Sequence, residues 1–337
     1  MSGAFQSTPH IERSEVELSI VVPFYNEELN IDWFFERIEA VLAPLNVAYE
    51  VVCVNDGSRD QTVSFLIAHH HRNPAIKVVD FSRNFGKEVA ITAGMDYTVG
   101  NAVVVMDADL QDPPELIHEL LAKWREGFDV VYAVRRSRQG ETWLKRFTAY
   151  SFYRVIGRVS NTPIPRDTGD FRLLDRRVVE VLKQIPERTR FMKGLFAWVG
   201  FRQTAVEYDR APRYQGRSTW NYWKLWNFAL DGIFSFSLVP LKLWGYLGLM
   251  ISLITLMYAG FLVVRTLLFG VDVPGYASLM VAVLSLGGVQ LMTLGILGEY
   301  LGRVYEEVKG RPLYLVRNAY GFSNYPAVSM STPSSRN

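Results

Sequence analysis

The chain contains 337 residues with a formal net charge of +2, and its mean hydropathy of +0.06 is close to neutral. So small a net charge gives no electrostatic argument for binding nucleic acid. The single cysteine, Cys53, excludes a framework of intramolecular disulfides and is typical of a reducing compartment. The neutral mean arises from a long polar part followed by a strongly apolar part, so more than one domain class is expected.

Five short apolar runs in the polar part are rich in β-branched residues and do not alternate with polar positions. Such runs are typical of parallel strands that are buried on both faces. They cover residues 18–23, 49–55, 76–81, 102–106 and 129–134. Between these runs, apolar residues recur with the period of an α-helix, at residues 31–42, 61–71, 87–99 and 114–126. This alternation predicts an α/β fold with a doubly wound, mostly parallel sheet.

Polar residues follow three of the predicted strands. The sequence PFYNE at 23–27 follows the first, NDGSRD at 55–60 follows the second, and DADLQ at 107–111 follows the fourth. An open parallel sheet binds its ligands outside the carboxyl ends of its strands, so these segments form the candidate site. The sequence has no G-x-G-x-x-G after the first strand and no P-loop motif, which disfavours a Rossmann dehydrogenase or a P-loop enzyme.

Asp107 and Asp109 are two positions apart at the end of an extended run, so their carboxylates can point to the same side. Mg²⁺ and Mn²⁺ prefer such oxygen ligands together with phosphate oxygens of a substrate. Gln111 continues the same side and offers a further oxygen. The alternative is that these carboxylates cap the following helix, and for Asp112 a capping role alone is also open. Carboxylates at two other strand ends favour the metal site.

The three motifs together resemble the family 2 glycosyltransferases of GT-A fold. With DTGDFR at 167–172 and two late apolar runs, the chain is similar to the polyprenyl-phosphate glycosyltransferases. That group includes dolichol-phosphate mannose synthase and, closer in layout, the bacterial bactoprenol glucosyltransferases. The likeness covers about residues 16–310. It implies that Asp109 and Gln111 ligate the metal and that the nucleotide is bound by Pro23, Tyr25, Asn26, Glu27, Asp56 and Asp107.

Arginines follow the fifth predicted strand, at positions 135, 136 and 138. A lipid phosphate that enters the site needs cationic donors, and arginine offers two parallel hydrogen bonds. For Arg136 and Arg138 an ordinary solvated basic turn is an open alternative, so Arg135, the first residue after the strand, is favoured. The resemblance implies that one of these arginines contacts the acceptor phosphate.

The candidate catalytic residues are Asp109, Asp170 and Arg135. Of these, Asp170 is the carboxylate expected beside the acceptor. A hydroxyl acceptor needs a general base, but a phosphomonoester has a second pKa near 6 and is already anionic at pH 7. Asp170 therefore has two open roles, as a base or as a group that positions the sugar or the acceptor.

Residues 213–238 place aromatic side chains at helical spacing, which predicts helices that lie on a membrane surface. Packing against the catalytic domain is the alternative. Arg213 and Arg217 can meet lipid phosphates there. The resemblance implies that the loop from 213 to 218 closes over the site once nucleotide binds.

Two uncharged runs, 243–264 and 273–298, each exceed the roughly 20 apolar residues that cross a bilayer core of about 30 Å. Positive residues flank the pair of runs, which predicts that both termini of the chain lie in the cytoplasm. The expected location of the protein is a bacterial inner membrane. Gly298 and Gly302 allow close helix contact within the hairpin or between subunits. The expected parts are a disordered tail at 1–15, a catalytic domain at 16–212, interface helices at 213–238, two transmembrane helices at 239–302 and a cytoplasmic C-terminal tail at 303–337.

The expected function is an inverting transfer of one hexose, glucose from UDP-glucose, to a polyprenyl phosphate. A GDP-mannose transferase like dolichol-phosphate mannose synthase is an open alternative. A processive polysaccharide synthase is disfavoured because the chain lacks a Q-x-x-R-W motif and further spans. A glycolipid translocase without enzymatic activity is disfavoured because the two spans carry no polar face.

Overall fold

The computed structural model describes residues 14–136, 168–208 except 186, 188, 189 and 191, single positions between 248 and 269, and 275–322. The chain divides into two compact units, which are described separately here. The first unit contains residues 1–153, 162–221 and 311–337, and the second contains 154–161 and 222–310.

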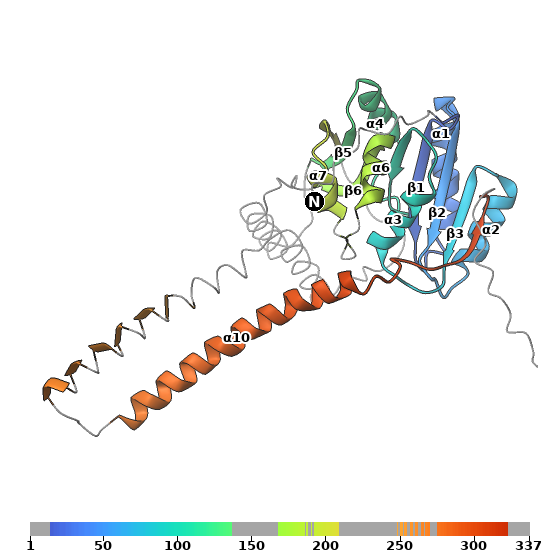
Figure 1. The fold of residues 1–337 in the computed structure, drawn as a ribbon. Helices are drawn as coiled ribbons and strands as arrows, with labels where there is room; N and C mark the ends of the chain where they lie inside the picture. The colour runs from blue at the N-terminus through green and yellow to red at the C-terminus, as the bar shows by residue number, and fades with distance from the viewer. Residues whose placement is uncertain are drawn as a thin grey trace, which may run out of the picture. The chain divides into compact units, whose positions relative to one another are not determined.

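The first unit is built on an eight-stranded sheet with the order β7-β5-β6-β4-β1-β2-β3-β8 (Figure 1). The strands are β1 (Leu18–Phe24), β2 (Tyr49–Asn55), β3 (Ile76–Phe81), β4 (Ala102–Val105), β5 (Val130–Arg135), β6 (Thr168–Asp175), β7 (Gln203–Tyr208) and β8 (Val316–Tyr320). The pairs β1–β2, β1–β4, β2–β3 and β5–β7 are parallel, whereas β6 and β8 run antiparallel to their neighbours. The predicted α/β class and the mostly parallel sheet are confirmed.

Helices cover both faces of this sheet. On one face α1 (Ile31–Leu42) and α2 (Thr62–Arg72) share one apolar cluster with alternate residues of β1, β2 and β3. On the same face α4 (Leu116–Arg125) packs on β4, β5, β6 and β7. On the other face α3 (Lys87–Tyr97) packs on Val52, Val54 and Val79. The helix α6 (Arg176–Gln184) packs beside α3, and the short α7 (Met192–Trp198) follows it. Apolar residues on both faces of the strands explain why their sequences show no alternation.

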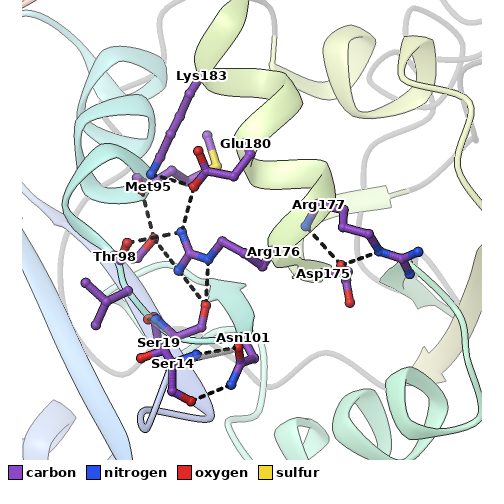
Figure 2. A network of polar contacts seen from close by, with 12 residues as sticks. Ser14, Ser19, Met95, Thr98, Asn101, Asp175, Arg176, Arg177, Glu180 and Lys183 are labelled. Atoms are coloured by element: carbon purple, nitrogen blue, oxygen red, sulfur yellow. Dashed lines mark hydrogen bonds and ion pairs between the residues drawn. The ribbon is translucent and has the colours of Figure 1, made fainter. Parts of the chain in front are cut away.

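A buried arginine ties α6 to the beginning of β4. Arg176 Nε donates to the carbonyl of Gly100 at 2.8 Å, and its Nη1 donates to the carbonyl of Thr98 at 3.1 Å (Figure 2). Glu180 pairs with the same guanidinium from the next turn, at 3.3 Å. Asp175 caps α6 by accepting from the backbone N–H of Arg177 at 2.9 Å. These contacts fix β6 beside β4 at the end of the sheet remote from the candidate site.

The C-terminal segment of the first unit adds the edge strand β8 to β3, a pairing that the sequence patterns did not predict. Tyr314 stacks on Phe81 with ring centroids 5.2 Å apart and donates its hydroxyl to Asp96 of α3 at 2.8 Å. The backbone N–H of Ser82 donates to the carbonyl of Leu315 at 2.9 Å. This segment therefore supports the loop between β3 and α3, which leads into the candidate site.

The second unit contains α10 (Tyr276–Val308), which carries many exposed apolar side chains. Near its C-terminal end Arg303 pairs with Glu299 at 2.9 Å, as their spacing of four residues predicts. Within the described parts of the chain, no helix has both the length and the apolar character that a membrane crossing requires. The hairpin at 239–302 stays a prediction, and the predicted interface helices at 213–238 lie outside the described residues.

Candidate active site

The loops after β1 and β2 bind each other. Asn26, whose φ is 55°, accepts from the backbone N–H of Arg59 at 2.9 Å, and its own N–H donates to Ser58 Oγ at 3.0 Å. The backbone N–H of Glu27 donates to Thr62 Oγ1 at 2.9 Å. These hydrogen bonds hold the two loops against each other at the carboxyl edge of the sheet.

Three more residues predicted to hold the base, Pro23, Tyr25 and Glu27, belong to β1 and to the loop that follows it. Pro23 is within β1 and half-buried, and the ring of Tyr25 is 42% exposed. Glu27 accepts from Asn30 Nδ2 at 2.6 Å, which holds its carboxylate at the beginning of α1. Pro23, Tyr25 and Glu27 are thus on one edge of the sheet, and their contact with a nucleotide stays a prediction.

Asp56 is buried and holds the loop that begins α3. Its carboxylate accepts from the backbone N–H groups of Phe85 at 2.7 Å and Gly86 at 3.0 Å, and from Asn84 Nδ2 at 2.9 Å. Burial raises the pKa of Asp56, although the two backbone N–H groups oppose the rise. Asp56 therefore holds the loop that leads to Lys87. If a nucleotide binds Asp56, it contacts the same carboxylate.

Lys87, which the sequence analysis did not single out, lies between two of the predicted site residues. Its Nζ is 2.6 Å from Asp107 Oδ1 and 2.5 Å from Asp170 Oδ2. The two carboxylates meet because β4 and β6 are antiparallel neighbours, with Val105 opposite Arg172. Lys193 of α7 approaches the other oxygen of Asp170, at 3.8 Å. The structure thus brings Asp107 and Asp170 together around one ammonium group.

The charges in this cluster depend on one another. Burial alone would lower the pKa of Lys87, but Asp107 and Asp170 outweigh it and raise that pKa well above its usual value. Burial opposes ionisation of Asp170, yet Lys87 and Lys193 outweigh it and hold the pKa of that carboxyl well below its usual range. For Asp107, burial raises the pKa and Lys87 opposes the rise. Lys87 and Asp170 are therefore a charged pair at neutral pH.

Asp109 and Gln111 complete the segment after β4. The backbone N–H of Gln111 donates to Asp109 Oδ1 at 3.2 Å, and Leu110 between them is buried with φ 47°. Among the described residues, no group of three or more His, Cys, Asp or Glu side chains is arranged as a complete metal site. Two carboxylates and an amide nevertheless fit a hard divalent ion that shares its coordination with phosphate oxygens. Asp107 already pairs with one cation, the Lys87 ammonium.

Arg135 belongs to a second cluster at the same edge. Its Nε donates to the hydroxyl of Tyr208 at 3.2 Å, and its Nη2 is 3.9 Å from Asp112 Oδ1. The Tyr208 hydroxyl also donates to Asp112, so Asp112 has a role besides the helix capping that was left open for it. The N-cap of α4 is Glu115 instead. A Cβ added at Gly169 would lie 3.3 Å from Asp112 Oδ2, so this cluster touches the residue before Asp170.

The other arginines predicted to bind the acceptor differ from Arg135 in their setting. Arg136 is exposed and pairs with Glu207 at 3.4 Å, which matches the solvated basic turn that was its alternative. Arg138, Arg213 and Arg217 lie outside the described residues. Of the predicted acceptor arginines that the structure describes, only Arg135 is joined to the strand-end cluster.

Several known proteins are similar in sequence to this chain over most of its length. Residues 19–183 match the family model described as glycosyl transferase family 2. A Synechocystis protein named as an uncharacterized glycosyltransferase is 67% identical over 92% of this chain and 98% of its own. A bactoprenol glucosyl transferase derived from prophage SfII in Shigella flexneri is 47% identical, over 90% and 99%. A prophage bactoprenol glucosyl transferase homolog of Escherichia coli is 44% identical, again over 90% and 99%.

The chain belongs to glycosyl transferase family 2. Its relatives over nearly the full length include proteins named as bactoprenol glucosyl transferases, so the predicted resemblance is confirmed.

This family 2 enzyme has one more ionisable residue in the site that the sequence patterns did not reveal. Glu88, in the first turn of α3, accepts from the backbone N–H of Met192 at 3.3 Å. Burial, and then the charge of Asp170, raises the pKa of Glu88 to about 7, against the opposing effect of Lys87 and Lys193. Glu88 is far from Asp170 and Met192 in the sequence. The raised pKa of Glu88 is therefore apparent only in the folded chain, where α3 lies near β6 and α7.

The raised pKa predicts a pH dependence of stability. Between the usual value of 4.5 and about 7 the folded chain binds more protons at Glu88 than the unfolded chain does. The protonated side chain therefore favours folding fully below about pH 4.5, and this contribution is lost as the pH rises to about 7. We expect the thermal midpoint of wild type to fall relative to that of Glu88→Gln from about pH 5 to about pH 8. Parallel curves would contradict the assignment, and Glu119→Gln, at an exposed position of α4, is the control.

Proposed function

We propose that this enzyme transfers a single glucose from UDP-glucose to a polyprenyl phosphate, with inversion at the anomeric carbon. The observation that carries the proposal is the convergence of Asp107, Asp170, Lys87 and Arg135 at one edge of the sheet. The names of the bactoprenol glucosyl transferases, which match over almost their whole length, support a lipid phosphate as the acceptor and glucose as the sugar. A monophosphate acceptor and a diphosphate leaving group are both anions, and this edge supplies cationic groups for them.

On the donor side, Pro23, Tyr25, Asn26, Glu27 and Asp56 would hold the base and ribose, and Asp107 the rest of the nucleotide. Asp109 and Gln111, with Asp107, would hold Mg²⁺ or Mn²⁺. A divalent ion bound there neutralises the charge that develops on the departing diphosphate. Asp56 keeps the loop before α3 in place, so donor binding and the position of Lys87 depend on the same carboxylate.

On the acceptor side, Arg135 would bind the lipid phosphate while one of its oxygens attacks the anomeric carbon. A phosphomonoester is already anionic near pH 7, so the reaction needs no general base. Asp170, ionised through its pairs with Lys87 and Lys193, would then position the sugar. Attack from the face opposite the diphosphate inverts the configuration and gives a β-linked lipid phosphate from an α-linked donor.

We further propose that the runs 243–264 and 273–298 form a transmembrane hairpin, with both termini in the cytoplasm. The support is the lack of charge in the two runs and the positive residues that flank them. An enzyme that takes a water-soluble donor and a lipid acceptor has to work at such a surface. Arg213 and Arg217 would meet lipid phosphates at that surface.

Product analysis tests the reaction. Purified full-length enzyme in detergent should convert UDP-glucose and a short polyprenyl phosphate into one β-glucosyl lipid and UDP, seen by mass spectrometry and NMR. GDP-mannose and an aminoarabinose donor serve as competing substrates. Excess chelator, or Asp109→Ala in a folded protein, should remove most of the turnover. Polymer formed from donor alone, a product of retained configuration, or full activity in chelator would refute the proposal.

Arg135 and Arg136 form a matched pair for the acceptor site. Loss of a charged hydrogen bond to phosphate should raise the KM for polyprenyl phosphate by roughly 10- to 100-fold in Arg135→Ala, with a much smaller change for the donor. Arg136→Ala removes only an exposed pair with Glu207 and should change neither constant by more than about 2-fold. Equal effects of Arg135→Ala on donor and acceptor would show that it only supports Tyr208 and Asp112.

Thiol labelling tests the orientation. A cysteine placed by Asp272→Cys should react with an impermeant reagent added to intact cells. Leu29→Cys, at a position 74% exposed in the first unit, should react only after the cells are opened. The native Cys53 is buried and contributes little background. Labelling of position 29 but not 272 in intact cells would overturn the orientation.

A further inference from the structure

Lys87 occupies the position from which Asp107 would bind a cation. Its Nζ reaches both oxygens of that carboxylate, Oδ1 at 2.6 Å and Oδ2 at 2.9 Å, and Asp170 Oδ2 at 2.5 Å. An ammonium that contacts both oxygens of a carboxylate leaves little room for an ion on the same atoms. Lys87 and a divalent ion therefore compete for Asp107.

The ammonium is held in place from its backbone as well as from its partners. Lys87 is the first residue of α3, and the N–H groups of the two residues before it donate to the buried Asp56. Its two carboxylate partners, Asp107 and Asp170, stabilise the charged form of the ammonium. Its side chain is 38% exposed, so the ammonium can turn toward a ligand while its backbone stays fixed.

A nucleoside diphosphate changes the balance at this point. Its oxygens can accept hydrogen bonds from an ammonium and can also coordinate a divalent ion. When diphosphate is present, Lys87 can move from Asp107 to a phosphate oxygen and leave the carboxylate to the ion. Without diphosphate, an incoming ion has to displace the ammonium and meets its repulsion.

We propose that Lys87 makes metal binding depend on the nucleotide: in the empty enzyme it neutralises Asp107 and excludes the divalent ion, and it moves to the diphosphate when ion and nucleotide bind together. The inference rests on the proposed function, because it assumes that Asp107 and Asp109 take a divalent ion with a diphosphate. Such coupling is reciprocal, so the ion strengthens nucleotide binding by the same factor. The alternative is a fixed ion pair that persists in every state.

The test is the affinity for Mn²⁺, measured by electron paramagnetic resonance on the full-length protein in detergent without sugar donor or lipid. Wild type should bind Mn²⁺ weakly alone and roughly 10- to 100-fold more tightly with saturating UDP, after correction for Mn²⁺ bound to free UDP. Lys87→Met, which keeps the length of the side chain but removes its charge, should bind Mn²⁺ at least about 10-fold more tightly without UDP. Lys87→Arg should keep the dependence on UDP.

Lys193→Met is the matched control, since Lys193 approaches Asp170 at its other oxygen, Oδ1, at 3.8 Å. Its Mn²⁺ affinity should stay within about 3-fold of wild type.

Equal Mn²⁺ affinity of wild type and Lys87→Met without UDP would overturn the proposal. So would wild-type binding that is equally tight with and without UDP, a result that needs no variant to fold. If wild type still makes glucosyl lipid in that case, the proposed function stands and only the role of Lys87 fails. Absence of Mn²⁺ binding even with UDP would overturn both the coupling and the metal site.

Discussion

The candidate site depends on one ammonium group placed between two carboxylates. Asp107 ends β4 and Asp170 lies on the antiparallel neighbour β6, so the sheet brings two negative charges together at its carboxyl edge. Without a cation these carboxylates would repel each other, and one would take up a proton. Lys87, the first residue of α3, prevents this protonation because its ammonium lies between the two carboxylates. Asp56 holds the loop that leads into α3. A nucleotide bound near Asp56 can therefore act on the charges around Asp107 and Asp170.

The acceptor side follows a similar principle with different residues. Arg135 ends β5, and the hydroxyl of Tyr208 from the parallel neighbour β7 lies between it and Asp112. Burial, and then the negative charge of Asp112, raises the pKa of Tyr208, so the phenol stays a neutral donor. The guanidinium is thus oriented by the Tyr208 hydroxyl and by a buried carboxylate. In both clusters a cation is positioned by at least one carboxylate at the carboxyl edge of the sheet, which suits the proposed diphosphate leaving group and phosphate acceptor.

The parallel core was readable from the sequence because each of its elements is built from local signals. The β-branched runs predicted at 18–23, 49–55 and 76–81 are β1, β2 and β3 within one residue, and α1 was predicted at its observed bounds. Strands β6, β7 and β8 were missed for a physical reason. β7 and β8 lack the continuous apolar run that marked the central strands, because each contains exposed residues, among them Glu207 and Arg317. β8 owes its place to pairing with β3 and to the stack of Tyr314 on Phe81. A short edge strand of this kind is stabilised by its neighbours rather than by its own composition.

By itself the sequence determined the fold class, the family and the set of strand-end carboxylates, because these follow from patterns within short segments. Only the tertiary structure decided which charged groups share one site. The antiparallel register of β4 and β6 places Asp170 beside Asp107, and the packing of α3 on this sheet adds Lys87 and Glu88, which no motif had marked. Asp112 became a partner of Arg135 and Tyr208 rather than a helix cap for the same reason. Pairing between charges depends on distance in space, and residues far apart in the chain reach that distance only when the sheet brings their strands together.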